Sequence, residues 1–188
     1  MEKKGFSKPS CPRWEDFPDI ELYMDQVIFV LEKHLAVFFP EEKSLTSTMI
    51  NNYVKQKLVQ PPRNKRYERG QLARLFSICI LKSFMQLSDV RDLMENLENG
   101  RGEREVYELF ADQMQRALGC VFGAEDVRGE MPDDPNEGAL LSALIAVASI
   151  IESRRMLCLA KENWPVRAVS DSEKKDKAEK KEKKEKKK

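Results

Sequence analysis

The sequence predicts an all-α protein, and two observations carry this prediction. Apolar residues recur at spacings of three and four along most of the 188-residue chain, which is the periodicity of a helix with one buried face. Strand-like alternation of apolar and polar residues is rare. With 41% hydrophobic residues, a chain of this length can bury a core, which excludes a collagen-like or wholly disordered protein.

Each of the first two predicted helices is followed by proline, Pro40 after the first and Pro61-Pro62 after the second. Apolar spacing predicts a helix over residues 20–39, immediately before a proline that cannot continue it. Thr46 is suited to cap the start of a second helix. This helix should end near Lys57, because Pro61 and Pro62 forbid its continuation.

The rest of the chain before its polar tail also has helical periodicity. Apolar residues from Leu72 to Phe84 predict a third helix. Three more helices are expected over residues 89–97 with Ser88 as the cap, 103–118, and 135–161 with Asp134 as the cap. The last of these is apolar on nearly all sides up to Ile151, so it must be covered on several sides. Residues 119–131 are expected to form a loop.

The net charge of +1 conceals a segregation of charge along the chain. Residues 43–86 hold nine basic residues and one acidic residue, a sum of +8. The sums are −4 over residues 1–42, −7 over residues 87–169 and +4 over the Lys/Glu-rich residues 170–188. A basic segment inside an acidic protein is the distribution expected when one surface meets a polyanion.

The sequence offers no set of residues for a metal site or an active site. Its four cysteines are scattered and its single histidine, His34, stands alone, so we interpret them as structural and expect no cofactor, no metal and no enzymatic activity. The N-terminus lacks a signal-peptide core, and the apolar residues 139–151 are too few to cross a bilayer, which requires about 20. We therefore expect a cytoplasmic protein without a membrane partner.

The basic segment coincides with a helix rich in Thr, Ser and Asn, a proline-containing basic loop and an amphipathic helix, within residues 45–75. Ser and Thr side chains bond phosphates or base edges, and Asn can bond adenine through two contacts. The basic loop could follow the DNA backbone as a wing. The candidate DNA-binding residues are Thr46, Ser47, Thr48, Asn51, Asn52, Tyr53, Lys55, Arg63, Lys65, Arg66, Tyr67 and Arg69.

This segment resembles the winged helix-turn-helix of MerR-type proteins. Residues 46–57 correspond to the recognition helix, Leu58-Val59 to the apolar pair that follows it, Pro62 to the proline, and Lys65-Arg66-Tyr67 to the tip of the wing. The stretch MINNYVKQKLVQPPRNKRY, which follows ELYMDQV, is also similar to an uncharacterised group in Gram-positive bacteria, a domain of unknown function.

The resemblance implies a sequence-specific, DNA-binding transcriptional regulator associated with the nucleoid. It implies that Tyr53, Lys65 and Tyr67 contact the DNA backbone. Asn51 stands where MerR proteins usually have Arg, which leaves the base preference open. The expected partners are double-stranded DNA, a second copy of the chain in a possible homodimer, and an unknown effector. A metal-responsive regulator is unsupported, because no metal-sensing cysteine pattern follows.

These interpretations divide the chain into four regions. We expect a flexible N-terminus over residues 1–13 and a MerR-like winged helix-turn-helix domain over 14–98. A C-terminal helical region for regulation or dimerisation should occupy residues 99–165, followed by a disordered tail over 166–188.

Several alternatives remain open at this point. Asn51 and Asn52 could be ordinary solvent-facing or capping residues, and Tyr53 and Tyr67 could be packing residues. The last helix could complete the core, supply a dimer interface, or do both. The lysine-rich tail could be a solvated extension or add nonspecific affinity for nucleic acid. The alternative function is a non-enzymatic protein-interaction module that keeps the helix-turn-helix fold without binding DNA.

Overall fold

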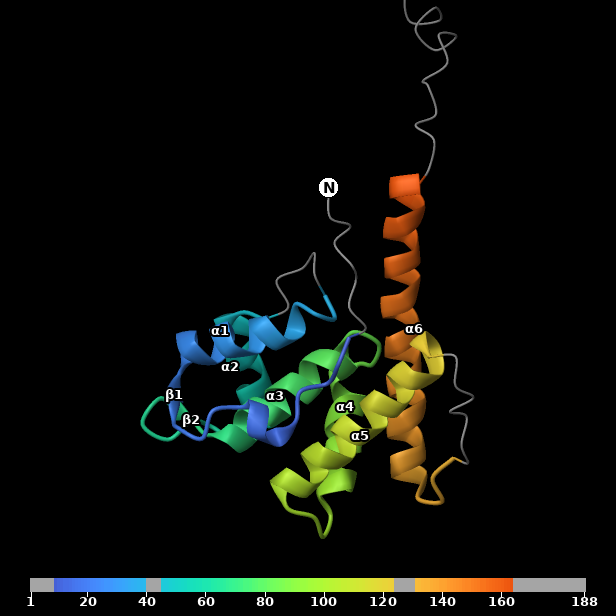
Figure 1. Ribbon diagram of the computed structural model, residues 1–188. Helices are drawn as coiled ribbons and strands as arrows, with labels where there is room; N and C mark the ends of the chain where they lie inside the picture. Colours follow the sequence, from blue (N-terminus) through green and yellow to red (C-terminus); the bar gives the residue numbers. More distant parts are fainter. Residues whose placement is uncertain (1–8, 40–44, 124–130, 164–188) are drawn as a thin grey trace, which may run out of the picture. The chain divides into compact units, whose positions relative to one another are not determined.

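Helix α3 (Arg69–Lys82) is the central helix of the fold, and α1 (Met24–Leu35), α4 (Leu87–Glu98) and α5 (Glu103–Phe122) pack against it (Figure 1). The structure, a computed structural model, describes residues 9–39, 45–123 and 131–163. The other elements, in chain order, are the 3-10 helix η1 (Trp14–Asp16), β1 (Leu22–Tyr23), α2 (Ser47–Lys55), β2 (Arg66–Tyr67) and α6 (Pro135–Asn163).

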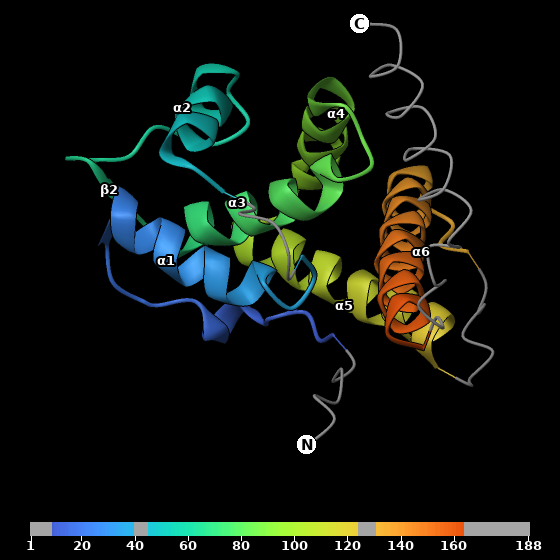
Figure 2. The ribbon, with the colours of Figure 1, turned by 90° about the horizontal axis from the view of Figure 1, so that it is seen from above.

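The protein is mostly helical, as the sequence predicts, with one small sheet among its described residues. Strands β1 and β2 pair antiparallel, with Leu22 opposite Tyr67 and Tyr23 opposite Arg66. Each strand immediately precedes a helix, so the sheet joins the start of α1 to the start of α3 (Figure 2). The sheet is therefore a small local element that links the starts of two helices.

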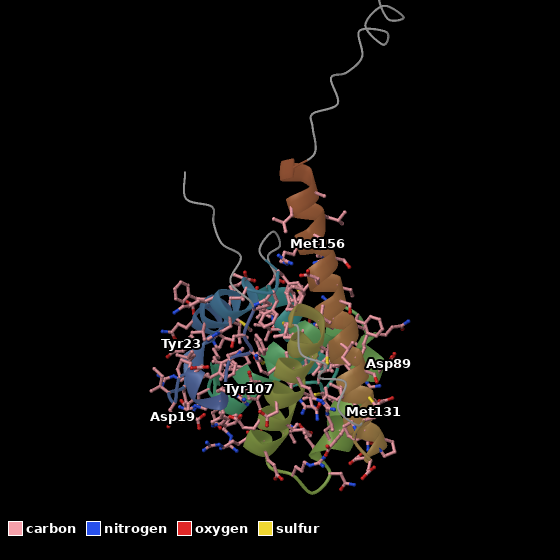
Figure 3. All side chains as sticks on the ribbon, turned by 45° about the vertical axis from the view of Figure 1, so that its right-hand side comes forward. Asp19, Tyr23, Asp89, Tyr107, Met131 and Met156 are labelled. Carbon is pink, nitrogen blue, oxygen red and sulfur yellow. The ribbon has the colours of Figure 1, made fainter. Side chains whose placement is uncertain are left out.

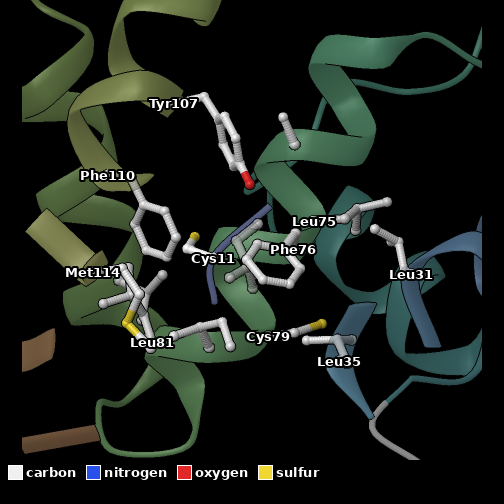
Figure 4. Close-up of a cluster of buried hydrophobic side chains, with 14 of the residues drawn as sticks. Cys11, Leu31, Leu35, Leu75, Phe76, Cys79, Leu81, Tyr107, Phe110 and Met114 are labelled. Atoms are coloured by element: carbon white, nitrogen blue, oxygen red, sulfur yellow. The ribbon is translucent and has the colours of Figure 1, made fainter. Parts of the chain in front are cut away.

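Aromatic side chains fill the middle of the core, and Figure 4 shows Phe76, Tyr107 and Phe110 among them. The ring of Phe76 on α3 lies 5.9 to 6.5 Å, between centroids, from the rings of Phe17, Phe38, Tyr107 and Phe110. These rings come from four different segments, and each is almost fully buried. Large aromatic residues bury the most apolar area per side chain, so this cluster contributes strongly to the stability of the fold.

The predicted first helix is too long at both ends. Residues 20–23 are not helical, because Leu22 and Tyr23 pair with the distant strand β2. Helix α1 begins at Met24, where the side chain of Gln26 accepts a hydrogen bond from the Tyr23 amide at 2.9 Å. It ends at Leu35, several residues before the proline.

Three further boundaries differ from the prediction. Phe84, placed on the third helix, lies beyond α3 and its side chain is 56% exposed. Helix α4 begins before Ser88, which therefore does not cap it. Helix α5 continues to Phe122, so only part of the expected loop remains, and residues 124–130 lie outside the described residues. The predicted start of α6 is confirmed, with Asp134 accepting a hydrogen bond from the Asn136 amide at 2.7 Å.

The N-terminal segment expected to be flexible is packed over residues 9–13, because the core residues of α5 hold it. Cys11 is buried, and the Tyr107 hydroxyl donates a hydrogen bond to the Pro12 carbonyl at 2.8 Å. Arg13 forms ion pairs with Glu108 at 3.0 Å and Asp112 at 2.6 Å. Residues 1–8 lie outside the described residues.

Helix α5, which follows the boundary expected at residues 98 and 99, packs on α3. It supplies Tyr107, Phe110 and Met114 to the same core as α3, because the apolar face of α3 needs this cover. By its internal contacts the chain divides into two compact units, Met1–Glu152 and Ser153–Lys188. The predicted disordered tail, residues 166–188, lies outside the described residues.

Helix α6 contributes to both units, and its part up to Glu152 is covered on one side. Leu140, Leu144, Val147 and Ala148 are buried, whereas Ser142 and Ser149 are exposed. None of the helices in the described ranges combines the length and the apolar character needed to span a membrane.

Candidate nucleic-acid interface

Helix α2 presents one buried face and one polar, exposed face. Ile50 and Tyr53 point into the core, with the preceding Leu45 also buried. The exposed residues recur at helical spacing on the other side, and they are Ser47, Thr48, Asn51, Asn52 and Lys55. Because residues three and four apart lie on one face of a helix, the five candidates form a single polar surface.

The start of α2 is fixed by two hydrogen bonds. Thr46 caps the helix as predicted, its hydroxyl accepting a hydrogen bond from the Met49 amide at 3.2 Å. The carboxylate of Glu32 on α1 accepts a hydrogen bond from the Leu45 amide at 2.7 Å. Thr46 is thus engaged in the cap, and α1 sets where α2 begins.

The end of α2 is a Schellman motif. The Leu58 amide donates to the Tyr53 carbonyl at 2.9 Å, and the Lys57 amide donates to the Val54 carbonyl at 3.0 Å. This motif turns the chain through a left-handed residue, which here is Lys57 with φ 61°. The helix therefore ends at Lys55, two residues before the predicted end, because the chain reverses at Lys57.

Side chains of α3 hold the loop that follows α2. Arg74 donates a hydrogen bond to the Leu58 carbonyl and forms an ion pair with Glu98 at the end of α4. Gln71 donates to the Gln60 carbonyl at 2.8 Å. The Arg74 side chain is only 16% exposed, and burial lowers the pKa of its guanidinium, against the opposing effect of nearby carboxylates. Helix α2 is thus anchored at both ends, by α1 and by α3.

The predicted wing is a tight hairpin turn that ends in β2. The Arg66 amide donates to the Arg63 carbonyl at 2.8 Å, and the two residues between them, Asn64 and Lys65, have φ of 49° and 64°. Two positive φ values at the centre of a four-residue turn are the signature of type I′, the turn that matches the twist of a β-hairpin. All four side chains are exposed.

Acidic residues before β1 already neutralise two of the candidate arginines. Arg66 forms an ion pair with Glu21 at 3.6 Å, and Arg69 forms one with Asp19 at 3.6 Å. Asp19 and Tyr23 lie toward the same edge of the protein (Figure 3). By contrast, Lys55, Lys57, Arg63 and Lys65 form no ion pair within the described ranges. The uncompensated positive charge therefore lies at the end of α2 and at the turn of the wing.

Tyr53 and Tyr67 do not lie on this surface. Each side chain is 1% exposed, and burial raises the pKa of both hydroxyls. The Tyr53 hydroxyl is buried without a hydrogen-bond partner among the described residues. In this arrangement both tyrosines pack in the core, which agrees with their interpretation as packing residues.

Sequence reasoning missed several residues that shape this surface. Lys57 is one of the nine basic residues of the segment 43–86, but no local pattern distinguishes it, and none marks Arg74, Asp19 or Glu21. Their partners are far away in the sequence, as with Arg74 and Glu98. The charge segregation along the chain was the one signal that could have included Lys57.

Cys11 and Cys79 are buried in the core, and His34 packs against Phe17. Burial raises the pKa of the Cys11 and Cys79 thiols to about 12. The His34 ring meets the edge of Phe17 at 5.4 Å between centroids, and burial lowers its pKa. Within the described ranges, no three or more His, Cys, Asp or Glu side chains gather where they could hold a metal ion.

Comparison with known proteins identifies a family for this chain. No curated protein and no solved structure matches the chain. A family model described as "Domain of unknown function (DUF1836)" matches residues 12–113, more than half of the chain. The matched range begins at the N-terminal segment held by Tyr107 and includes α5 up to its middle. The chain belongs to the DUF1836 family.

Proposed function

We propose that the protein is a sequence-specific DNA-binding transcriptional regulator, not an enzyme, built on a MerR-like winged helix-turn-helix. One observation carries the proposal: α2 exposes a continuous polar face, and uncompensated lysine and arginine side chains lie beside it. A recognition helix needs this combination, since polar side chains contact base edges while cations contact phosphates.

In the proposed mechanism α2 enters the major groove. Ser47, Thr48, Asn51 and Asn52 are the residues available for base edges and nearby phosphates. Asn52 also accepts a hydrogen bond from Gln56 at 3.2 Å, so Asn51 is the freer amide and the better candidate for adenine. Lys55, Arg63 and Lys65 would contact phosphates and fix the position of the helix on the duplex.

A homodimer associated with the nucleoid is part of the proposal. Regulators with a recognition helix commonly bind two half-sites through a symmetric pair of subunits. The exposed Ser142 and Ser149 on the first part of α6 would allow a second chain to approach closely. The effector that would regulate such a dimer is unknown.

The decisive test is a fluorescence-anisotropy titration with a random-sequence duplex over a range of KCl concentrations. We expect binding at or below about 10⁻⁴ to 10⁻⁶ M, with the logarithm of the affinity falling linearly with the logarithm of the salt concentration. Selection from a random duplex library should then return a preferred sequence. Absence of binding at low salt would contradict the proposal.

Variants of single residues, compared with a control, test which part of the surface contacts DNA. Lys55→Ala and Arg63→Ala should each weaken binding to all sequences and reduce the salt slope by about one. Lys82→Ala is the control, because Lys82 is an exposed lysine of the same basic segment at the far end of α3. Asn51→Ala should instead reduce the preference for the selected sequence, by about 1–3 kcal/mol.

The alternative is a non-enzymatic protein-interaction module that binds an acidic partner through the same surface. The charge distribution favours it, because the acidic residues 87–169, with a sum of −7, could engage the basic segment of a neighbouring chain. The titration separates the two functions: an interaction module would not bind random duplex, whereas a regulator would.

A further inference from the structure

Two lysines on the proposed DNA surface have a backbone conformation that favours glycine. Lys57 has φ 61° and Lys65 has φ 64°, and the third such non-glycine residue in the described ranges is Asn64. Asparagine tolerates the left-handed region because its short side chain can bond locally, whereas a lysine side chain has no such compensation. Both lysines therefore occupy positions at which the local structure would be more stable with another residue.

The turn at Lys57 is otherwise well formed for its role. Both hydrogen bonds of the Schellman motif are present, and Leu58 and Tyr53, the residues whose apolar contact commonly accompanies it, are both buried. Glycine is the usual residue at the left-handed position of this motif. At Lys65 glycine is again favoured, as the second central residue of a type I′ turn that begins with Asn.

Neither lysine compensates for this strain through contacts of its side chain. Both side chains are exposed, and neither forms an ion pair within the described ranges. Left-handed residues that are not glycine cluster at functional sites, where the strain is accepted in exchange for a side chain that the site requires.

We propose that Lys57 is a further phosphate-binding residue of this surface, kept as lysine against the preference of its backbone, with Lys65 as its counterpart on the wing. The inference rests on the proposed function. It adds to the polar face of α2 a cation just beyond the end of the helix, so that DNA would be held from the helix end as well as from the wing.

Three substitutions of Lys57 in the full chain separate charge from strain. Lys57→Gly removes both the charge and the backbone strain. Lys57→Gln removes the charge but keeps the strain, because a side chain remains at a left-handed position. Lys57→Arg keeps both the charge and the strain. The measurements are the melting temperature and the anisotropy titration with random duplex at several KCl concentrations.

We expect opposite changes in stability and binding for Lys57→Gly. Its melting temperature should rise by about 2–4 °C, because the left-handed strain is removed, while its affinity falls and its salt slope decreases by about one. Lys57→Gln should lose as much affinity without the rise in melting temperature, and Lys57→Arg should bind like the wild type. Lys65→Gly should repeat the pattern of Lys57→Gly.

The outcomes that would overturn the inference differ from those that would overturn the proposed function. If the wild type binds duplex and Lys57→Gln binds equally well, Lys57 is not a phosphate contact although the protein binds DNA. If Lys57→Gln melts earlier and binds unchanged, Lys57 acts on the dipole at the end of α2, and the inference is again wrong. If the wild type binds no duplex, the proposed function itself fails before any variant is compared.

Discussion

The guanidinium of Arg66 lies over the ring of Tyr23, 4.9 Å from its centroid, and donates a hydrogen bond to the Tyr23 hydroxyl at 3.0 Å. These two residues face each other across the β1–β2 ladder, so the interaction secures the base of the wing. Glu21 lies beside the same guanidinium. The wing arginine is therefore oriented by the segment before α1.

Neutralising the acidic residues of that segment should strengthen nonspecific DNA binding. In Asp19→Asn/Glu21→Gln, Arg69 and Arg66 lose their carboxylate partners and become available to phosphates. We expect a higher affinity for random duplex and a salt slope steeper by up to about two, measured by anisotropy titration. Asp25→Asn removes an exposed carboxylate without an ion pair in the described ranges, and serves as control. A slope equal to that of the wild type would show that these arginines do not face DNA.

Arg74 should be important for stability and for the placement of α2. Arg74→Leu removes the donor to the Leu58 carbonyl and leaves Glu98 without its partner. We expect a loss of about 2 kcal/mol in the free energy of unfolding, measured in urea, since hydrogen bonds to charged groups contribute about 1.5–3 kcal/mol. Arg91→Ala is the control, because its pair with the adjacent Asp92 is exposed and should contribute almost nothing. A loss as small as in the control would mean that the loop after α2 is held by other contacts.

His34 should make the protein less stable in acid. Burial against Phe17 lowers its pKa below the ordinary 6.5, so the unfolded chain takes up a proton before the folded chain does. The stability that neutral His34 contributes is complete above pH 6.5 and is lost as the pH falls through the lower, folded pKa. The melting temperature should therefore fall less between pH 7.5 and 5 in His34→Gln than in the wild type.

The same residue allows a direct check, because the chain has one histidine. A single imidazole signal should titrate by NMR with a midpoint below 6.5. Asp16→Asn should move the midpoint lower still, since the Asp16 carboxylate opposes the effect of burial. A midpoint above 6.5 in the wild type would contradict the packing of His34 beside Phe17.

A fragment that ends at residue 98 should not fold. It lacks Tyr107, Phe110 and Met114, and it leaves Phe76 and much of α3 exposed to water. We expect no cooperative thermal transition by circular dichroism for residues 1–98, whereas residues 1–152, which form one compact unit, should melt cooperatively. Cooperative melting of the shorter fragment would restore the domain boundary suggested by the sequence.

Features that depend on neighbouring residues could be predicted from the sequence. The cap at Thr46 and the start of α6 after Asp134 are local hydrogen-bond patterns, and both were predicted correctly. The exposed face of α2 also followed from helical spacing. Strand β1 could not be predicted, because a two-residue strand is defined only by its partner. Its residue Leu22 pairs with Tyr67, and two helices lie between these residues in the sequence.

The burial of individual side chains also could not be predicted from the sequence. A tyrosine in a basic segment can be either a DNA contact or a core residue. For Tyr53 and Tyr67, only the packing of α2 and β2 onto the rest of the fold shows that the side chains are buried. The anchoring of residues 9–13 by Tyr107 and Glu108 was equally hidden, because a polar, proline-containing segment looks like a free end until its partners on α5 are placed.

The pairing of Leu22 with Tyr67 also has a consequence for the order in which the protein folds. The ladder closes a loop that contains both α1 and α2, so the entropic cost of bringing its two strands together falls once those helices have packed. A two-residue ladder with exposed side chains at its tip offers little protection by itself. We therefore expect the Arg66 amide, which donates to the Arg63 carbonyl within the wing, to exchange its hydrogen faster than the amides of α3, and the wing to be the last part of its unit to form and the first to open.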